Sequence, residues 1–179
     1  EVIDAENAYL ENPDISIAEL MKYVKGPDFP TGGIVVNKEA LKEIYETGTG
    51  KIRIRGRVTT EKGKNGRVNV VITEIPYTMI GQGIGKFLQD VADLAEKKVT
   101  NDIADITNQS SKDGIRIVIE LKRDADADNF INLLYTKTRL EDTFGVNMLA
   151  IRDGRPETMN LRSIMEACTA FQYETTRRK

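Results

Sequence analysis

The sequence predicts an α+β fold in which helices pack on a mixed β-sheet. Two patterns support this class. Apolar and charged residues alternate strictly over residues 51–58, as in a half-buried strand, and apolar residues recur at helical spacing over residues 84–99. A third observation is their order along the chain: strand, strand, helix, strand, strand, helix, strand. We therefore expect a sheet with helices packed against it, followed by the start of a long coiled-coil helix.

The N-terminal part predicts two helices and a connector. Residues 2–11 have a helical pattern, and a second helix begins after Ser16, whose hydroxyl can cap it while Glu19 occupies the third helical position. Gly26 is placed to end this helix. Residues 25–33, KGPDFPTGG, contain three glycines and two prolines. Prolines restrict φ and the final glycines permit positive φ, so this segment predicts a stiff joint with a flexible corner and not a reaction centre.

The middle of the chain supplies the expected sheet. A short helix capped by Asn37 and ended by Gly48 precedes the strand at 51–58. The GKNG segment predicts a hairpin to a second strand over residues 67–75. The remaining expected elements are a helix at 84–99, strands at 102–108 and 114–122 with Gly114 in the turn before the second, a helix at 126–140 and a strand at 144–151. The last strand is apolar on both faces, which is typical of a central strand.

The C-terminal segment has a different pattern. Apolar and small residues step by 3, 4, 3 and 4 positions through Leu161, Ile164, Cys168, Phe171 and Thr175. This spacing indicates the start of a heptad seam. Because the heptads stop early and the first residue is not Met, we expect a piece of a longer protein. The expected domains are a helical segment and connector at 1–36, an α+β domain at 37–158 and a coiled-coil start at 159–179.

The composition excludes several kinds of chemistry. The chain has 40% apolar and 30% charged residues, one cysteine and no histidine. It therefore cannot form an internal disulfide, a cysteine-cluster zinc site, a histidine metal site or a histidine-based catalytic triad. Its N-terminal stretch is acidic and is not a signal peptide, and no apolar run approaches the roughly 18–20 residues of a membrane span. The single cysteine suits a reducing cytoplasm.

A row of cations is the best candidate for a binding site. Four of these cations alternate along one predicted strand, about 6.6–6.8 Å apart by strand geometry. They are Lys51, Arg53, Arg55 and Arg57, and Lys62, Lys64 and Arg67 follow at the hairpin. The only acid between the first and the last of them is Glu61. Such a row suits a nucleic-acid phosphate backbone. The alternative is a solvated sheet face whose charge is balanced by acids elsewhere, and the net charge of −2 predicts no global attraction to nucleic acid.

Two further segments resemble known binding motifs but lack residues that those motifs require. The glycine-rich segment 81–86, GQGIGK, lacks the first glycine of a phosphate loop, and Phe87 stands where such a loop has Ser or Thr. The DADAD run at 124–128 lacks the Gly and Glu of an EF-hand, because Asn129 and Tyr135 occupy those positions. We interpret the first as a loose helix entry and the second as an acidic helix start. Cys168 is interpreted as a small core residue.

Several blocks together resemble the A subunit of bacterial type IIA topoisomerases, DNA gyrase and topoisomerase IV. They are GPDFPTGG, ETGTGKIRIRGRV, ITEIPY, DGIRIVIELKRDA and TFGVNMLAI followed by DGRP, in this order and spacing. The resemblance covers nearly the whole chain. It implies a location after the winged-helix region, comprising the connector, the tower domain and the first turns of the coiled coil. The segments TMIGQGIGK, NQSSK and FQYETTRRK depart from the family's usual pattern and leave gyrase or topoisomerase IV open.

The resemblance also implies a function. The family passes one duplex through a transient double-strand break in another, driven by ATP. Its catalytic tyrosine should lie upstream of Glu1, since none of the six tyrosines here stands in that motif, so no catalytic or metal residue is assigned and this piece alone should be inactive. Its implied role is to hold and bend the cleaved duplex. The implied partners are double-stranded DNA, a second copy of the breakage-reunion subunit in a homodimer, and the ATPase B subunit, which brings Mg²⁺ and ATP, in a bacterial, nucleoid-associated A₂B₂ enzyme. The alternative function is a protein-interaction scaffold that dimerises through its heptad helix.

Overall fold

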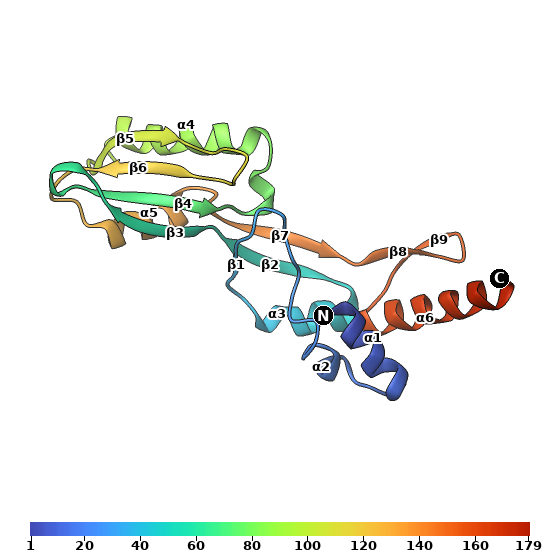
Figure 1. Cartoon of the computed structure of the whole chain (residues 1–179). Coiled ribbons are helices and arrows are strands. Elements are labelled where there is room, and N and C mark those ends of the chain that lie inside the picture. The colour runs from blue at the N-terminus through green and yellow to red at the C-terminus, as the bar shows by residue number, and fades with distance from the viewer. The chain divides into compact units, whose positions relative to one another are not determined.

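The computed structural model describes all 179 residues and divides them into two compact units. The first unit comprises Glu1–Asp28, Asn37–Ile52 and Gly145–Lys179, and the second comprises Phe29–Val36 and Arg53–Phe144. The chain therefore passes from one unit to the other four times, as can be followed by colour in Figure 1. The expected domains at 1–36, 37–158 and 159–179 are consecutive stretches of the chain. The two units instead group segments that contact one another, so they do not test the expected division, which stays a prediction.

The first unit is built mainly from helices. Its helices are α1 (Val2–Glu11), α2 (Ile17–Leu20), α3 (Glu39–Thr47) and α6 (Leu161–Arg178). It also contains the start of β2 (Thr49–Arg55) and the hairpin of β8 (Leu149–Arg152) with β9 (Arg155–Thr158). The buried core residues come from all four helices and the α1–α2 turn: Ala5, Ile15, Leu20, Tyr45, Leu161 and Met165.

Side-chain caps define two of these helix starts. The Ser16 hydroxyl accepts a hydrogen bond from the Glu19 N–H at 3.3 Å, which confirms the predicted cap. The Asn160 side chain accepts one from the Ser163 N–H at 2.7 Å. The predicted cap at Asn37 is wrong, because α3 begins one residue later, after Lys38. Asn37 instead donates its side-chain amide to the Lys51 carbonyl at 3.3 Å, and this strand contact competes with the capping role.

The second unit holds the main sheet. Its strands are β1 (Ile34–Val35), β3 (Arg57–Lys62), β4 (Val68–Glu74), β5 (Ile103–Asn108), β6 (Ile117–Leu121) and the start of β7 (Glu141–Asn147). Its helices are α4 (Gln82–Glu96) and α5 (Ala127–Lys137), with short 3₁₀ turns at Lys64–Gly66 and Tyr77–Met79. Four antiparallel strands form the sheet in the order β3-β4-β6-β5. One core joins this sheet to α4 through Phe87 and Val91 and to α5 through Phe130 and Leu134.

The predicted strand at 51–58 is two strands. Ile52 and Ile54 are buried and Lys51 and Arg53 are exposed, which confirms the predicted alternation. Gly56 interrupts the run, where its N–H donates to the Leu140 carbonyl at 2.8 Å. A Cβ at Gly56 would lie 2.5 Å from Leu140 Cδ1 and 2.7 Å from the Glu74 carbonyl oxygen. The break therefore follows from a close approach that only glycine permits.

The α+β class is confirmed, but the strands form three sheets instead of one. The prediction of a central strand at 144–151 is wrong. That segment divides at Met148 into β7 and β8, and β8 pairs with β9 in a two-stranded sheet. Leu149 is 58% and Ile151 78% exposed. The apolar residues on both faces of this segment did not indicate burial here. Residue composition does not determine whether another element packs over a strand.

The helix predicted at the C-terminus is confirmed as α6. Leu161 is buried at its start, whereas Phe171 is 68% exposed and Cys168 is also exposed. The interpretation of Cys168 as a core residue is therefore wrong, while the coiled-coil seam stays a prediction. None of the helices has both the length and the apolar character needed to cross a membrane.

Candidate nucleic-acid interface

The predicted row of cations lies on β2, β3 and the turn that follows β3. Lys51 belongs to the first unit, and Arg53, Arg55, Arg57, Lys62, Lys64 and Arg67 belong to the second. Within the second unit the six residues fall into two groups. Arg53, Arg55 and Arg57 are engaged by acidic side chains. The three cations of the hairpin form no ion pair. We describe the groups in that order.

Arg53 and Arg55 share one carboxylate. The side chain of Glu141, at the start of β7, is only 7% exposed and forms ion pairs with both guanidinium groups. Arg53 contacts Oε1 and Arg55 contacts Oε2, the latter through its Nε at 2.8 Å and a terminal nitrogen at 2.6 Å. Both arginines keep an exposed surface, 58% for Arg53 and 38% for Arg55.

Tyr135 supports this cluster from α5. The Arg55 guanidinium carbon lies 4.4 Å from the centre of the Tyr135 ring, within the range of a cation–π contact. The tyrosine hydroxyl donates a hydrogen bond to the Gly56 carbonyl at 2.9 Å. Burial raises the pKa of Tyr135, the Arg55 charge lowers it and the Glu141 charge raises it, so the net direction is upward. The ring therefore stays neutral at physiological pH and holds Arg55 in place.

Arg57 is paired with a different acid. Its Nε lies 3.2 Å from Glu74 Oε2, at the end of β4. The same carboxylate oxygen accepts a hydrogen bond from the Gly33 N–H at 2.8 Å. Glu74 therefore links Arg57 to the Gly33 backbone, while 55% of the Arg57 side chain stays exposed.

The β3–β4 hairpin carries the exposed cations. Lys62, Lys64 and Arg67 are exposed around a tight turn in which Asn65 has φ 58° and Gly66 has φ 75°. The turn is closed by the Gly63 N–H, which donates to the Arg67 carbonyl at 2.8 Å. We call Lys62, Lys64 and Arg67 the hairpin cations. They lie at the end of β3 and in the turn that follows it, and they form no ion pair.

Glu61, the acid nearest the hairpin cations in sequence, is engaged elsewhere. Its two carboxylate oxygens accept hydrogen bonds from Arg116 at 3.2 and 2.9 Å. These hydrogen bonds lower the pKa of Glu61, against a smaller opposing effect of desolvation, and the Arg116 charge lowers it further. Acidic partners thus engage Arg53, Arg55 and Arg57, and no ion pair reaches the hairpin cations.

Sequence reasoning missed Glu141 and Glu74. The two acids are separated from their arginine partners by 86 and 17 positions or more. Glu141 stands in no motif and occupies a strand start that the residue pattern does not place beside β2, whereas Glu74 belongs to the ITEIPY block. Only strand pairing could have indicated Glu74, since Arg57 lies opposite it in the β3–β4 register.

The other two motifs behave as structural features. Gly81 precedes α4 with φ 76° and offers no side-chain cap, which agrees with a loose helix entry. Asp126 caps α5 by accepting hydrogen bonds from the N–H groups of Asp128 and Asn129 at 3.1 and 3.3 Å. No group of three or more acidic or cysteine side chains is close enough to hold a metal ion.

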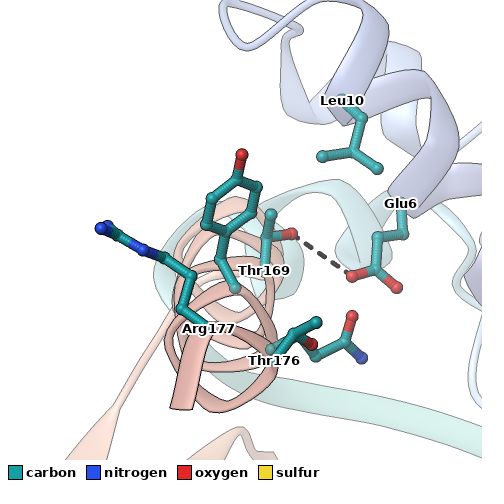
Figure 2. A pocket seen from close by; sticks show the side chains of 7 residues that line it. Glu6, Leu10, Thr169, Thr176 and Arg177 are labelled. Atoms are coloured by element: carbon teal, nitrogen blue, oxygen red, sulfur yellow. Dashed lines mark hydrogen bonds between the residues drawn. The ribbon is translucent and has the colours of Figure 1, made fainter. Parts of the chain in front are cut away.

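A groove in the first unit is one of several concave features. It lies between α1 and α6, has a volume of about 560 Å³ and is lined by Glu6, Leu10, Thr169, Gln172, Tyr173, Thr176 and Arg177. Figure 2 shows Glu6 and Leu10 reaching toward α6, where the Thr169 hydroxyl donates to Glu6 at 3.3 Å. The groove is open, and it brings no nucleophile and base together, so it is a surface feature without catalytic geometry.

Comparisons with known proteins agree on one family. The family of the A subunit of DNA gyrase/topoisomerase IV matches residues 1–179. The chain is 44% identical over its full length to the A subunit of DNA gyrase from Clostridium acetobutylicum, of which it covers 21%. It is 42% identical over 97% of its length to the A subunit of DNA topoisomerase 4 from Staphylococcus epidermidis, again covering 21%. The chain thus spans about a fifth of the length of these relatives, and it belongs to the family of the DNA gyrase/topoisomerase IV A subunit.

Proposed function

We propose that this chain is part of the DNA breakage-reunion subunit of a bacterial type II topoisomerase, in which it helps to hold and bend the cleaved duplex. Under this proposal the catalytic tyrosine lies outside the 179 residues and the chain alone is inactive. The partners are duplex DNA, a second copy of the breakage-reunion subunit, and the ATPase B subunit through which ATP and Mg²⁺ act. The site of action is the bacterial cytoplasm, at the nucleoid. Family membership and the names of the relatives support the breakage-reunion assignment.

One observation supports the DNA-contact role of the second unit. Within the second unit, the hairpin cations are the residues of the predicted row that are exposed and form no ion pair. Phosphate groups are bound by such cations without reading of the bases. Lys62 and Arg67 flank a turn fixed by backbone hydrogen bonding, so little conformational freedom of the main chain is lost when the turn meets a duplex.

Duplex binding over a series of salt concentrations tests this role. A duplex of about 30 base pairs, followed by fluorescence anisotropy, should bind this chain at low salt. The logarithm of affinity should fall with the logarithm of salt with a slope of about −3 if each hairpin cation meets one phosphate. The triple variant Lys62→Glu, Lys64→Glu, Arg67→Glu should lose most of the affinity and most of the salt dependence.

A matched variant separates the hairpin from charge in general. Lys97→Glu, Lys98→Glu, Lys112→Glu changes three other lysines of the second unit by the same total charge. The proposal requires that this control bind clearly more tightly than the hairpin variant. Equal losses in the two triple variants would reject a role specific to the hairpin, and no duplex binding by the unchanged chain at low salt would reject DNA contact altogether.

Exposed apolar residues favour a second function, a dimerisation scaffold. Phe171 on α6 is 68% exposed and Tyr173 is 72% exposed, and Phe171 lies on the heptad seam that the sequence predicts. Sedimentation velocity over a concentration series without DNA would test this alternative. A dimer that persists at high salt and is lost in Phe171→Glu would support it.

A further inference from the structure

We infer that Arg53, Arg55 and Glu141 form a phosphate-binding fork in the second unit, in which Glu141 is a positioning residue that holds the two guanidinium groups ready for one phosphate of the DNA backbone. This inference rests on the proposed function, because it names a second point at which the same protein meets the duplex. It also assigns a part to an acidic residue, which by charge alone would be expected to repel DNA.

The geometry of the cluster supports a fork. Each oxygen of the Glu141 carboxylate contacts a different arginine, so one group fixes two cations side by side. Tyr135 holds Arg55 from a second direction at 4.4 Å. A guanidinium group has five N–H donors, and planar donors arranged in this way match the oxygens of phosphate. Arg53 keeps 58% and Arg55 keeps 38% of its side-chain surface exposed to solvent.

The charges favour an anion as the ligand. Two guanidinium groups and one carboxylate leave a net charge of +1 at the cluster. The carboxylate is the buried member, 7% exposed, and the arginines are the exposed ones. An approaching phosphate therefore meets cations first, while the negative charge behind them is shielded. The Arg57–Glu74 pair differs, because one cation there faces one acid that also accepts from a backbone N–H.

The alternative hypothesis, that Glu141 competes with phosphate, predicts a change in duplex affinity of the opposite sign. If Glu141 merely competed with phosphate for the arginines, its neutralisation would raise duplex affinity. If Glu141 positions the arginines, its neutralisation lowers affinity although the chain becomes more positive, because two adjacent guanidinium groups without a shared carboxylate repel each other and lose their fixed orientation. The sign of one affinity change therefore decides between the two.

The experiment compares Glu141→Gln with Glu61→Gln in the duplex titration. Both variants remove one negative charge from an arginine-bound glutamate. We expect duplex affinity to fall about three- to tenfold in Glu141→Gln, about the net contribution of one ordinary hydrogen bond, and to stay equal or rise in Glu61→Gln. Affinity in Glu141→Gln that equals or exceeds that of the unchanged chain would overturn the inference.

A second pair of variants covers the case in which Glu141→Gln unfolds. Arg55→Lys keeps the charge and loses the planar donors, and Arg67→Lys makes the same change at the hairpin, where charge alone is required. The fork predicts a weaker duplex complex for Arg55→Lys and an unchanged one for Arg67→Lys. Equal affinities in these two variants would overturn the fork.

A titration with inorganic phosphate separates the fork from the proposed function. The Nε–Hε signals of Arg53 and Arg55 in NMR spectra should shift with phosphate in the unchanged chain and shift less in Glu141→Gln. Signals that do not respond would overturn the fork even if the chain binds DNA through its hairpin. Signals that respond in a chain without duplex affinity would leave a phosphate site and overturn its assignment to DNA.

Discussion

Glu141 and Asp142 are adjacent carboxylates in β7 that lie in different surroundings. Glu141 is bound by two arginines, as described above. Asp142 accepts a hydrogen bond from the Thr78 hydroxyl at 2.8 Å and one from the Arg139 guanidinium at 3.1 Å. Because successive strand side chains point to opposite faces, one residue serves the arginine cluster and the next ties β7 to the 3₁₀ turn after β4.

The environment of Asp142 predicts a stability change in acid. Burial alone raises the pKa of Asp142, but the hydrogen bonds from Thr78 and from the Thr143 N–H, together with Arg139, outweigh it and lower the pKa. The unfolded chain therefore binds a proton at this carboxyl at a higher pH than the folded chain does. The stabilising contribution is present above the ordinary aspartate pKa of about 4 and is lost as pH falls through the lower folded value.

Urea unfolding at pH 7 and at pH 3 measures this effect. The loss of unfolding free energy between the two pH values should be smaller in Asp142→Asn than in the unchanged chain. Asp113→Asn removes an exposed carboxylate that has no ion pair and serves as the control. An acid-induced loss that is the same in Asp142→Asn and the unchanged chain would show that this carboxyl does not contribute to it.

The connector at residues 25–33 is the clearest case at the scale of an element. Its second half is held in the second unit through Phe29, which packs against two other aromatic rings. The ring centre of Phe29 lies 5.7 Å from that of Tyr77 and 5.2 Å from that of Phe144. The Gly32 N–H donates to the Phe29 carbonyl at 3.0 Å, and the Gly33 N–H donates to Glu74 at 2.8 Å. One passage of the chain between the units, at 28/29, lies inside this segment.

Gly33 should be the most sensitive residue of this connector. It has φ +112°, and a Cβ there would lie 2.8 Å from Ile54 Cγ2, which belongs to a buried side chain. We expect Gly33→Ala to lower the free energy of unfolding by about 1–3 kcal/mol, because the strained φ and the steric contact both act on the folded state.

Gly85→Ala is the matched control, measured in the same urea titration. Gly85 lies in α4, where a Cβ meets nothing within 4 Å. That substitution should raise stability by about 0.5–1 kcal/mol through helix propensity. If Gly33→Ala proved as stable as Gly85→Ala, the close approach at Gly33 would not constrain the fold.

At the scale of the whole molecule, each unit has its own core. The core of the second unit contains Phe87, Phe130 and Leu134 from two helices, whereas that of the first contains Leu20 and Met165. The apolar residues of the β8–β9 hairpin and of the second half of α6 belong to neither core. Apolar content along the chain therefore divides into a part that stabilises the fold and a part that remains on the surface.

Two leucine truncations test this division. Leu134 is 0% exposed and Leu149 is 58% exposed. Leu134→Ala should lower the free energy of unfolding by about 2–5 kcal/mol, through lost burial and the cavity left behind. Leu149→Ala should change it by no more than about 0.5 kcal/mol. Circular dichroism during urea unfolding measures both, and similar losses would mean that the hairpin is covered in solution.

The sequence by itself determined the local elements and the family. Alternation marked the region of β2 and the start of β3 as one strand, and helical spacing marked α4. Ser16 marked a cap, the Asn-Gly turn marked a hairpin, and the spacing of several blocks indicated the family. These features depend on residues that are near one another in the chain, so periodicity and turn chemistry are sufficient to predict them. The sequence also pointed to the seven cations, four alternating over residues 51–57 and three at the hairpin.

Only the tertiary structure decided which of those cations are engaged. Glu141 reaches Arg53 and Arg55 through a strand that no local pattern places beside them, whereas Glu74 lies opposite Arg57 in the β3–β4 hairpin. Together they divide the row's residues in the second unit into a clamped group and the hairpin cations. The same cause explains the wrong expectation for residues 144–151, where Leu149 and Ile151 lie in a two-stranded hairpin and are exposed. Burial and ion pairing depend on residues far apart in the sequence, and the folded backbone is what brings them together.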